Sequence, residues 1–181
     1  MKKLFAALSL CSLLIACGAA RAEWPSDVTR VKSERGQVVT VSGKLESGRI
    51  IDDLSFASKS TVACFPATQN EKFRGRHVFF ATELPPRSIM TITVLPKDKS
   101  KDLSIYAYQV ATSTFVLPPE LSSCVSCEAE HRWDRPKRGK TQDHSRTVKL
   151  NATTNPYNVV IAVSHPAGTT AADFELKIAL E

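Results

Sequence analysis

The sequence has none of the common catalytic signatures. It contains no Gly-x-Ser-x-Gly turn, no glycine-rich phosphate loop, and no pair of histidines at the spacing of a helical metal site. It also lacks internal repeats and a convincing helical periodicity, which argues against helical bundles and repeat architectures. We therefore predict that the protein is not an enzyme and needs no cofactor. A triad built from distant residues leaves no local motif, so an enzyme of unrecognised type is kept as the last alternative.

Long apolar runs are also lacking, except for one at the N-terminus. That run covers Leu4–Ala16, follows two lysines, and is too short to span a bilayer. The tripeptide at 20–22 then places alanine at the two positions that signal peptidase reads. This order predicts a bacterial-type signal peptide over residues 1–22, and hence a periplasmic or secreted protein that begins at Glu23.

A second type of processing is compatible with the same segment. Leu14-Ile15-Ala16-Cys17 resembles the lipobox of bacterial lipoproteins. In this alternative the signal covers residues 1–16, and an acylated Cys17 anchors the protein to a membrane. No later run is long enough for a transmembrane helix, so contact with a membrane is expected only through such an anchor.

The chain has little excess of either charge sign. The formal net charge is +6 at pH 7, and signal cleavage at residue 22 removes three of the positive charges. This balance gives no reason to expect a specific nucleic acid as partner.

The sequence has five cysteines, and three of them remain after cleavage at residue 22: Cys64, Cys124 and Cys127. In an oxidising compartment at least two of them should pair. Closing Cys124 to Cys127 would contribute ~2 kcal/mol and closing Cys64 to either ~4 kcal/mol, but the short loop is favoured by proximity, so the pairing stays open. A zinc site of these three cysteines with His131 is a weaker alternative, because one Cys-x-x-Cys is a weak zinc pattern.

The remaining apolar residues recur mainly with period two, which is typical of β-strands. The clearest strands are expected at Ile89–Leu95, Leu103–Tyr108, Asn158–Val163 and Asp173–Leu180, with shorter candidates at Gln37–Val41, Arg49–Ile51, Thr61–Phe65 and His77–Thr82. Many short strands separated by turns predict an all-β, jelly-roll-like antiparallel β-sandwich. We place this single domain at 37–181, after a polar leader at 23–36 and with a long cysteine-containing basic loop at 117–146.

Two stretches of the chain also resemble a known family. They are HVFFATELPPRSIMTITVLPKDKSKDLSIYAYQV and YNVVIAVSHPAGTTAADFELKIAL. Their succession of aromatic, threonine-alternating and valine-alternating strands is similar to the bacterial pre-peptidase C-terminal domain, over roughly residues 75–180. The resemblance implies a jelly-roll-like β-sandwich and a non-catalytic module of secreted proteins.

A basic stretch is the strongest candidate for a ligand site. Residues 132–149 hold seven lysines and arginines against two aspartates, with one tryptophan among them. Clustered cations beside an exposed aromatic ring could bind an anionic polymer. The candidate ligand-binding residues are Arg132, Trp133, Arg135, Lys137, Arg138 and Lys140. We expect a binding module for a polyanion or a protein of the envelope or extracellular space. The alternative is a structural or accessory envelope lipoprotein with protein partners.

Overall fold

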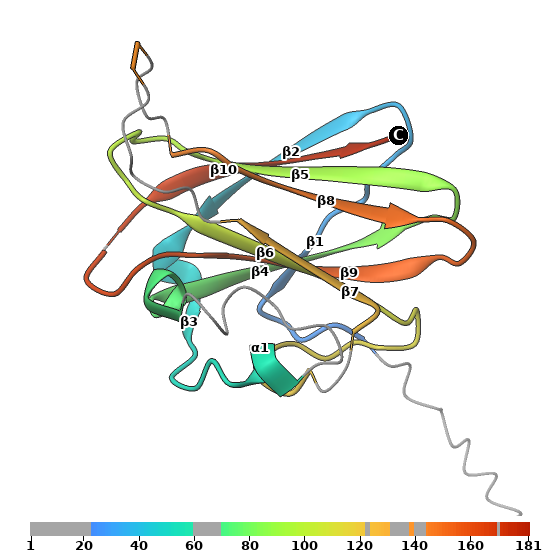
Figure 1. The fold of residues 1–181 in the computed structure, drawn as a ribbon, viewed down its shortest axis with the longest axis horizontal. Helices are drawn as coiled ribbons and strands as arrows, with labels where there is room; N and C mark the ends of the chain where they lie inside the picture. The colour runs from blue at the N-terminus through green and yellow to red at the C-terminus, as the bar shows by residue number, and fades with distance from the viewer. Residues whose placement is uncertain (1–22, 60–69, 122–123, 131–137, 140–143, 170) are drawn as a thin grey trace, which may run out of the picture.

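Two β-sheets packed face to face form the protein (Figure 1). The computed structural model describes residues 23–59, 70–121, 124–130, 138–139, 144–169 and 171–181. The first sheet has the order β1-β4-β9-β6-β7, with β3 also paired to β4, and the second has the order β2-β10-β5-β8. Every pairing between these strands is antiparallel except the short parallel pair of β1 and β4. The predicted all-β sandwich is therefore confirmed.

The elements are short, as the spacing of turns predicts. The strands are β1 (Val28–Arg30), β2 (Val38–Lys44), β3 (Arg49–Ile50), β4 (Arg76–Leu84), β5 (Ser88–Pro96), β6 (Ser104–Val110), β7 (Ser126–Glu130), β8 (Arg146–Ala152), β9 (Tyr157–Ser164) and β10 (Asp173–Leu180). Among the described residues, helical structure is limited to α1 (Phe56–Lys59) and the 3-10 turns η1 (Leu45–Ser47) and η3 (Asn70–Phe73). In the part of the chain that the structure describes, no helix has the length and apolar character needed to cross a membrane.

The main core lies between the two sheets and follows the alternation in the sequence. On β10, Phe174, Leu176 and Ile178 are fully buried, and the residues between them face outward. Leu176 pairs with Val94 of β5 and Ile178 with Ile92, so the buried faces of the two strands coincide. Side chains two residues apart share one face of a strand, which is why this face could be predicted from the sequence.

A second apolar layer covers the outer face of the first sheet. All seven residues of β6 are buried, because Ile105 and Ala107 face the main core while Tyr106 and Tyr108 face the opposite side. There the tyrosines meet Phe56 of α1, Phe73 of η3 and apolar residues of the segment after β6. Figure 1 shows α1 on the side of the first sheet that faces away from the second.

Two strands lie in segments that the sequence pattern did not indicate as strands. The polar leader at 23–36 contains β1, which adds a parallel strand to the edge of β4. The predicted loop at 117–146 contains β7, paired with β6 over five residues. Both strands lie at a sheet edge and are held by backbone hydrogen bonds, so they do not need the apolar alternation on which the prediction depended. The strand candidate at 61–65 lies outside the described residues.

Candidate functional site

A groove of about 770 Å³ opens where the end of β4 and the start of β9 meet the segments on either side of β1. Three aromatic rings and three prolines form an apolar wall along it: Trp24, Phe115, Tyr157, Pro85, Pro86 and Pro156. We call it the aromatic groove. Clefts of this volume with apolar walls and a few polar groups are typical of ligand sites.

The aromatic wall is built from segments far apart in the sequence. The side-chain amide of Asn158, at the start of β9, donates hydrogen bonds of 3.0 Å to the carbonyl oxygens of both Thr112 and Thr114. These bonds hold the loop that carries Phe115. The Phe115 ring meets Trp24 edge to face, with the ring centroids 5.3 Å apart. Asn158 is itself buried, so the hydrogen bonds that hold the loop come from a buried side chain and not from solvent-exposed contacts.

The proline wall is also held by hydrogen bonds. The guanidinium of Arg35 donates to the carbonyl oxygens of Pro86 and Arg87, each at 3.1 Å. The hydroxyl of Ser88 donates to the carbonyl of Pro85. These contacts hold a tight turn in which Arg87 has a left-handed backbone, with φ at 55°. The turn therefore presents its two prolines in a defined orientation.

The polar groups on the floor of the aromatic groove are paired with each other. The hydroxyls of Ser33 and Thr82 lie 3.0 Å apart, and Ser33 also lies 3.1 Å from the carbonyl oxygen of Glu83. Since Ser33 has one proton, the consistent arrangement is that it donates to Glu83 while Thr82 donates to Ser33. The floor thus has few hydrogen-bonding groups left for a ligand.

The charged side chains at the rim are not equivalent. Arg30 forms an ion pair of 3.5 Å with Glu23, and Lys32 forms one of 2.8 Å with Glu34. Glu83 is exposed and forms no ion pair with any residue that the structure describes. The aromatic groove therefore offers one negative charge that has no internal partner.

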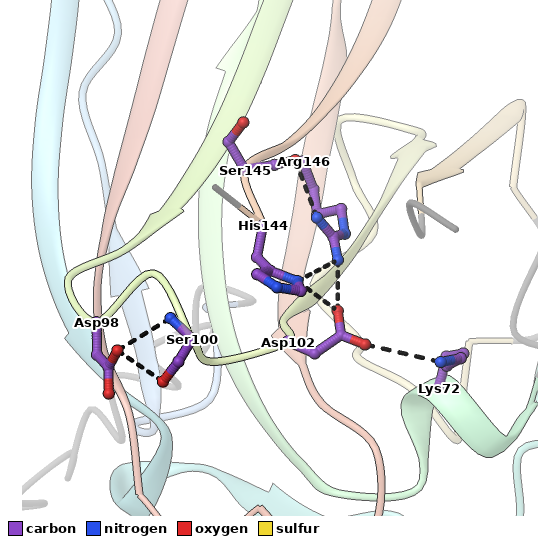
Figure 2. Close-up of polar contacts among 7 residues, drawn as sticks. All are labelled: Lys72, Asp98, Ser100, Asp102, His144, Ser145 and Arg146. Carbon is purple, nitrogen blue, oxygen red and sulfur yellow. Dashed lines mark hydrogen bonds and ion pairs between the residues drawn. The ribbon is translucent and has the colours of Figure 1, made fainter. Parts of the chain in front are cut away.

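A polar cluster centred on Asp102 lies elsewhere in the fold (Figure 2). Arg146, the first residue of β8, is completely buried and forms an ion pair with the Asp102 carboxylate. His144 lies 3.6 Å from the same carboxylate and Lys72 lies 3.7 Å from it. The cluster joins η3, the turn before β6 and the start of β8, which are distant in sequence.

The Asp102 cluster does not have the geometry of a hydrolase triad. A serine, Ser145, adjoins His144, but its side chain points away from the imidazole ring (Figure 2). The Asp102 carboxylate is engaged by the buried Arg146 rather than held by the histidine alone. The arrangement is that of a structural ion-pair network, and it corrects one prediction: Arg146 belongs to the basic stretch in sequence but contributes no exposed charge.

Two further histidines are buried and internally satisfied. The Nε2–H of His77 donates to the Phe73 carbonyl, and its Nδ1 accepts from the Tyr106 hydroxyl, both at 2.8 Å. Burial lowers the pKa of His77 to about 4. His165 donates from Nδ1 to the Pro166 carbonyl and accepts the Arg76 backbone N–H at Nε2, and burial lowers its pKa as well. Both rings are neutral packing residues at neutral pH.

Few of the residues predicted as sites from the sequence fall in the described part. The residues outside it are Cys17, Cys64, His131, Arg132, Trp133, Arg135, Lys137 and Lys140, so the basic site and the zinc alternative stay predictions. Arg138 is exposed. Cys124 is buried beside Tyr108, and Cys127 in β7 takes part in a disulfide, whose partner stays a prediction. Within the described residues, no three acidic, histidine or cysteine side chains gather as a metal site.

No sequence motif marks the aromatic groove. Trp24 lies in the segment interpreted as a leader, and Phe115 lies in a turn region, so neither took part in a strand pattern. The only local signals were isolated aromatics and prolines outside the strands.

Two solved β-structures are similar to this chain. No family model and no curated protein matches it. The periplasmic inhibitor of g-type lysozyme, PliG, from Aeromonas hydrophila is 7% identical, with a TM-score of 0.43 over 86% of this chain and 98% of that one. The pre-peptidase C-terminal domain of collagenase from Bacillus anthracis is 9% identical, with a TM-score of 0.40 over 88% of this chain and 100% of that one. The second is from the family that residues 75–180 resemble.

Proposed function

We propose that this protein is an exported, non-catalytic binding module whose ligand surface is the aromatic groove. The observation that carries the proposal is that Trp24, Phe115 and Tyr157 line one groove whose walls are held by buried or charge-assisted hydrogen bonds. Walls that are already ordered lose little conformational entropy when a ligand binds. Aromatic side chains are also the residues that contribute most per contact at binding surfaces.

The chemistry of the described residues supports binding rather than catalysis. A general base must be able to reach a substrate proton. His77 and His165 use both ring nitrogens within the protein, and Asp102 is held by a buried arginine. The aromatic groove itself is lined by neither histidine nor cysteine.

A second candidate function is the binding of an anionic polymer through the basic stretch. Two observations favour it: Arg138 is exposed, and Lys149 is exposed on the outer face of β8. The buried Arg146 must be left out of this surface. Affinity for a polyanion would weaken steeply with salt, because exposed charges are screened over a Debye length of ~8 Å at physiological ionic strength.

Location follows from processing in either case. Cleavage after residue 22 would release the module to the periplasm or the exterior, with Trp24 next to the new N-terminus. Acylation of Cys17 would hold the same module at a membrane as an accessory lipoprotein. Intact mass of the protein from native cells separates these two forms, and a major species that retains Met1 would contradict export.

The binding proposal is tested by NMR titration of the processed protein. Separate titrations use a proline-rich peptide, a neutral chito-oligosaccharide and a heparin fragment. Shifts of Thr82, Thr112 and Asn158 signals locate binding at the aromatic groove and support the proposal. Shifts confined to residues such as Arg138 and Lys149 support the polyanion candidate instead. If no groove signal moves with any of the three probes, the proposed surface is wrong.

A further inference from the structure

We propose that the aromatic groove binds an extended, proline-rich peptide segment that carries a basic residue opposite Glu83. This inference rests on the proposed function and names the class of ligand for the same site. It follows from three properties of the groove: its rings, its unused donors and its single unpaired charge.

The wall suits the shape of a polyproline II segment. Such a segment has three residues per turn and no internal hydrogen bonds, and it is recognised in grooves lined by aromatic rings. Here Trp24, Phe115 and Tyr157 line one groove together with Pro85, Pro86 and Pro156. Proline rings can pack against these faces, and a segment already extended in solution loses little entropy on binding.

The donors present in the groove suit the backbone of that ligand. The indole N–H of Trp24 and the hydroxyl of Tyr157 form no hydrogen bond with any residue that the structure describes, and both side chains are half-buried. Tryptophan and tyrosine at interfaces usually find a partner for these groups. A polyproline II backbone presents carbonyl oxygens without competing N–H donors at its prolines, so these two donors can both be satisfied by it.

The hydrogen bonds within the groove also disfavour a neutral glycan as its ligand. Sugar hydroxyls lose hydrogen bonds to water on binding and need partners in the site to replace them. The hydroxyls of Ser33 and Thr82 bond to each other, and both amide protons of Asn158 are taken by backbone carbonyls. The floor therefore has little to offer a ligand rich in hydroxyls, whereas proline rings require no hydrogen bond from it.

The charge at the rim selects a cationic residue. Arg30 and Lys32 are paired with Glu23 and Glu34, so they attract an acidic ligand only weakly. Glu83 lines the same groove, is exposed and has no ion-pair partner in the described part of the chain. A lysine or arginine that flanks the prolines would complete this charge, with a charge-assisted hydrogen bond to the carboxylate.

The experiment compares three synthetic dodecapeptides with the processed protein. The first is a decaproline followed by two arginines, the second has glutamines in place of the arginines, and the third has Gly-Ser repeats before two arginines. Trp133→Phe leaves Trp24 as the single tryptophan of the mature chain, so its fluorescence reports on the groove. We expect saturable binding of the first peptide, binding about three- to tenfold weaker for the second, and none for the third.

Variants then separate the contributions, read by NMR or calorimetry with melting temperatures to establish folding. Tyr157→Phe keeps the ring and removes the donor, and it should lower the affinity for the first peptide several-fold. Trp24→Ala should lower the affinity for the first peptide by about tenfold or more. Glu83→Gln should abolish the preference for the arginine peptide over the glutamine peptide. Glu46→Gln, an exposed acid that does not line the groove, is the matched control and should leave both affinities unchanged.

The outcomes distinguish this inference from the proposed function. Chito-oligosaccharide binding at the groove without peptide binding would overturn the proline-rich ligand and keep the binding module. Equal affinity for the proline and Gly-Ser peptides would also overturn the proline-rich ligand, because the arginines that both peptides share would then explain the binding. If no NMR signal of the groove shifts with any probe, both proposals are wrong.

Discussion

Replacing Asp102 with alanine should destabilise the protein strongly, because it removes the counter-charge of a buried arginine. Arg146 has no exposed surface, and its Nε has no hydrogen-bond partner among the residues that the structure describes. Breaking a buried ion pair by removing one member typically costs 3–5 kcal/mol. The Asp102 side chain keeps 18% of its exposure, so water can reach part of the vacated space, and we expect about 3 kcal/mol.

Urea unfolding at pH 7 measures this change as a lower midpoint with a nearly unchanged slope. A loss of about 3 kcal/mol is a large part of the 5–15 kcal/mol that stabilises a typical domain. The matched control is Asp98→Ala, because the Asp98 carboxylate is exposed and bonds only within its own turn, to Ser100. We expect that variant to lose less than about 1 kcal/mol.

The double variant Asp102→Ala with Arg146→Met tests the cause. It removes both charges and keeps an apolar side chain in the buried position, so it should recover much of the loss, as paired replacement of buried ions often does. If Asp102→Ala costs no more than Asp98→Ala, or if the double variant is less stable than the single one, the ion-pair reasoning is wrong.

Burial holds the pKa of His77 at about 4 against 6.5 in the unfolded chain, so the unfolded state binds more protons in between. The free energy of unfolding should therefore fall by about 3 kcal/mol as the pH drops from 6.5 to 4, and an equal drop in a His77→Gln variant would contradict this cause. Peptide mapping without reductant should show Cys127 joined to Cys64, the pairing that closes the longer loop, and reduction should remove about 4 kcal/mol of stability; a bridge between Cys124 and Cys127 would disprove this pairing. Replacing Arg135, Lys137, Arg138 and Lys140 with serine should abolish any salt-sensitive affinity for heparin without changing the melting temperature, and a variant that unfolds would make the basic stretch a structural element.

The fold class could be predicted because the alternation of β5 and β10 is complete in the local sequence. Met90, Ile92 and Val94 alternate with threonines, and period two by itself assigns one face of that strand to the core. In β6 the alternation of Ile105 and Ala107 with Tyr106 and Tyr108 likewise separates two faces, but it does not predict the second apolar layer. The rings that cover Tyr106 and Tyr108 come from α1 and η3, whose few residues form no periodic pattern.

The candidate site could not be predicted, because each of its properties depends on residues that meet only in the folded chain. Trp24 and Phe115 are 91 positions apart and touch because Asn158 of β9 holds the loop between β6 and β7. Arg146 was counted among the cations of the basic stretch as if it were exposed, but in the folded protein it is buried. Its burial depends on Asp102, and a charge is stable inside a protein only when such a partner is present. Local alternation thus determined which faces are apolar, whereas the tertiary pairing of distant loops decided which polar and aromatic groups are left open to a ligand.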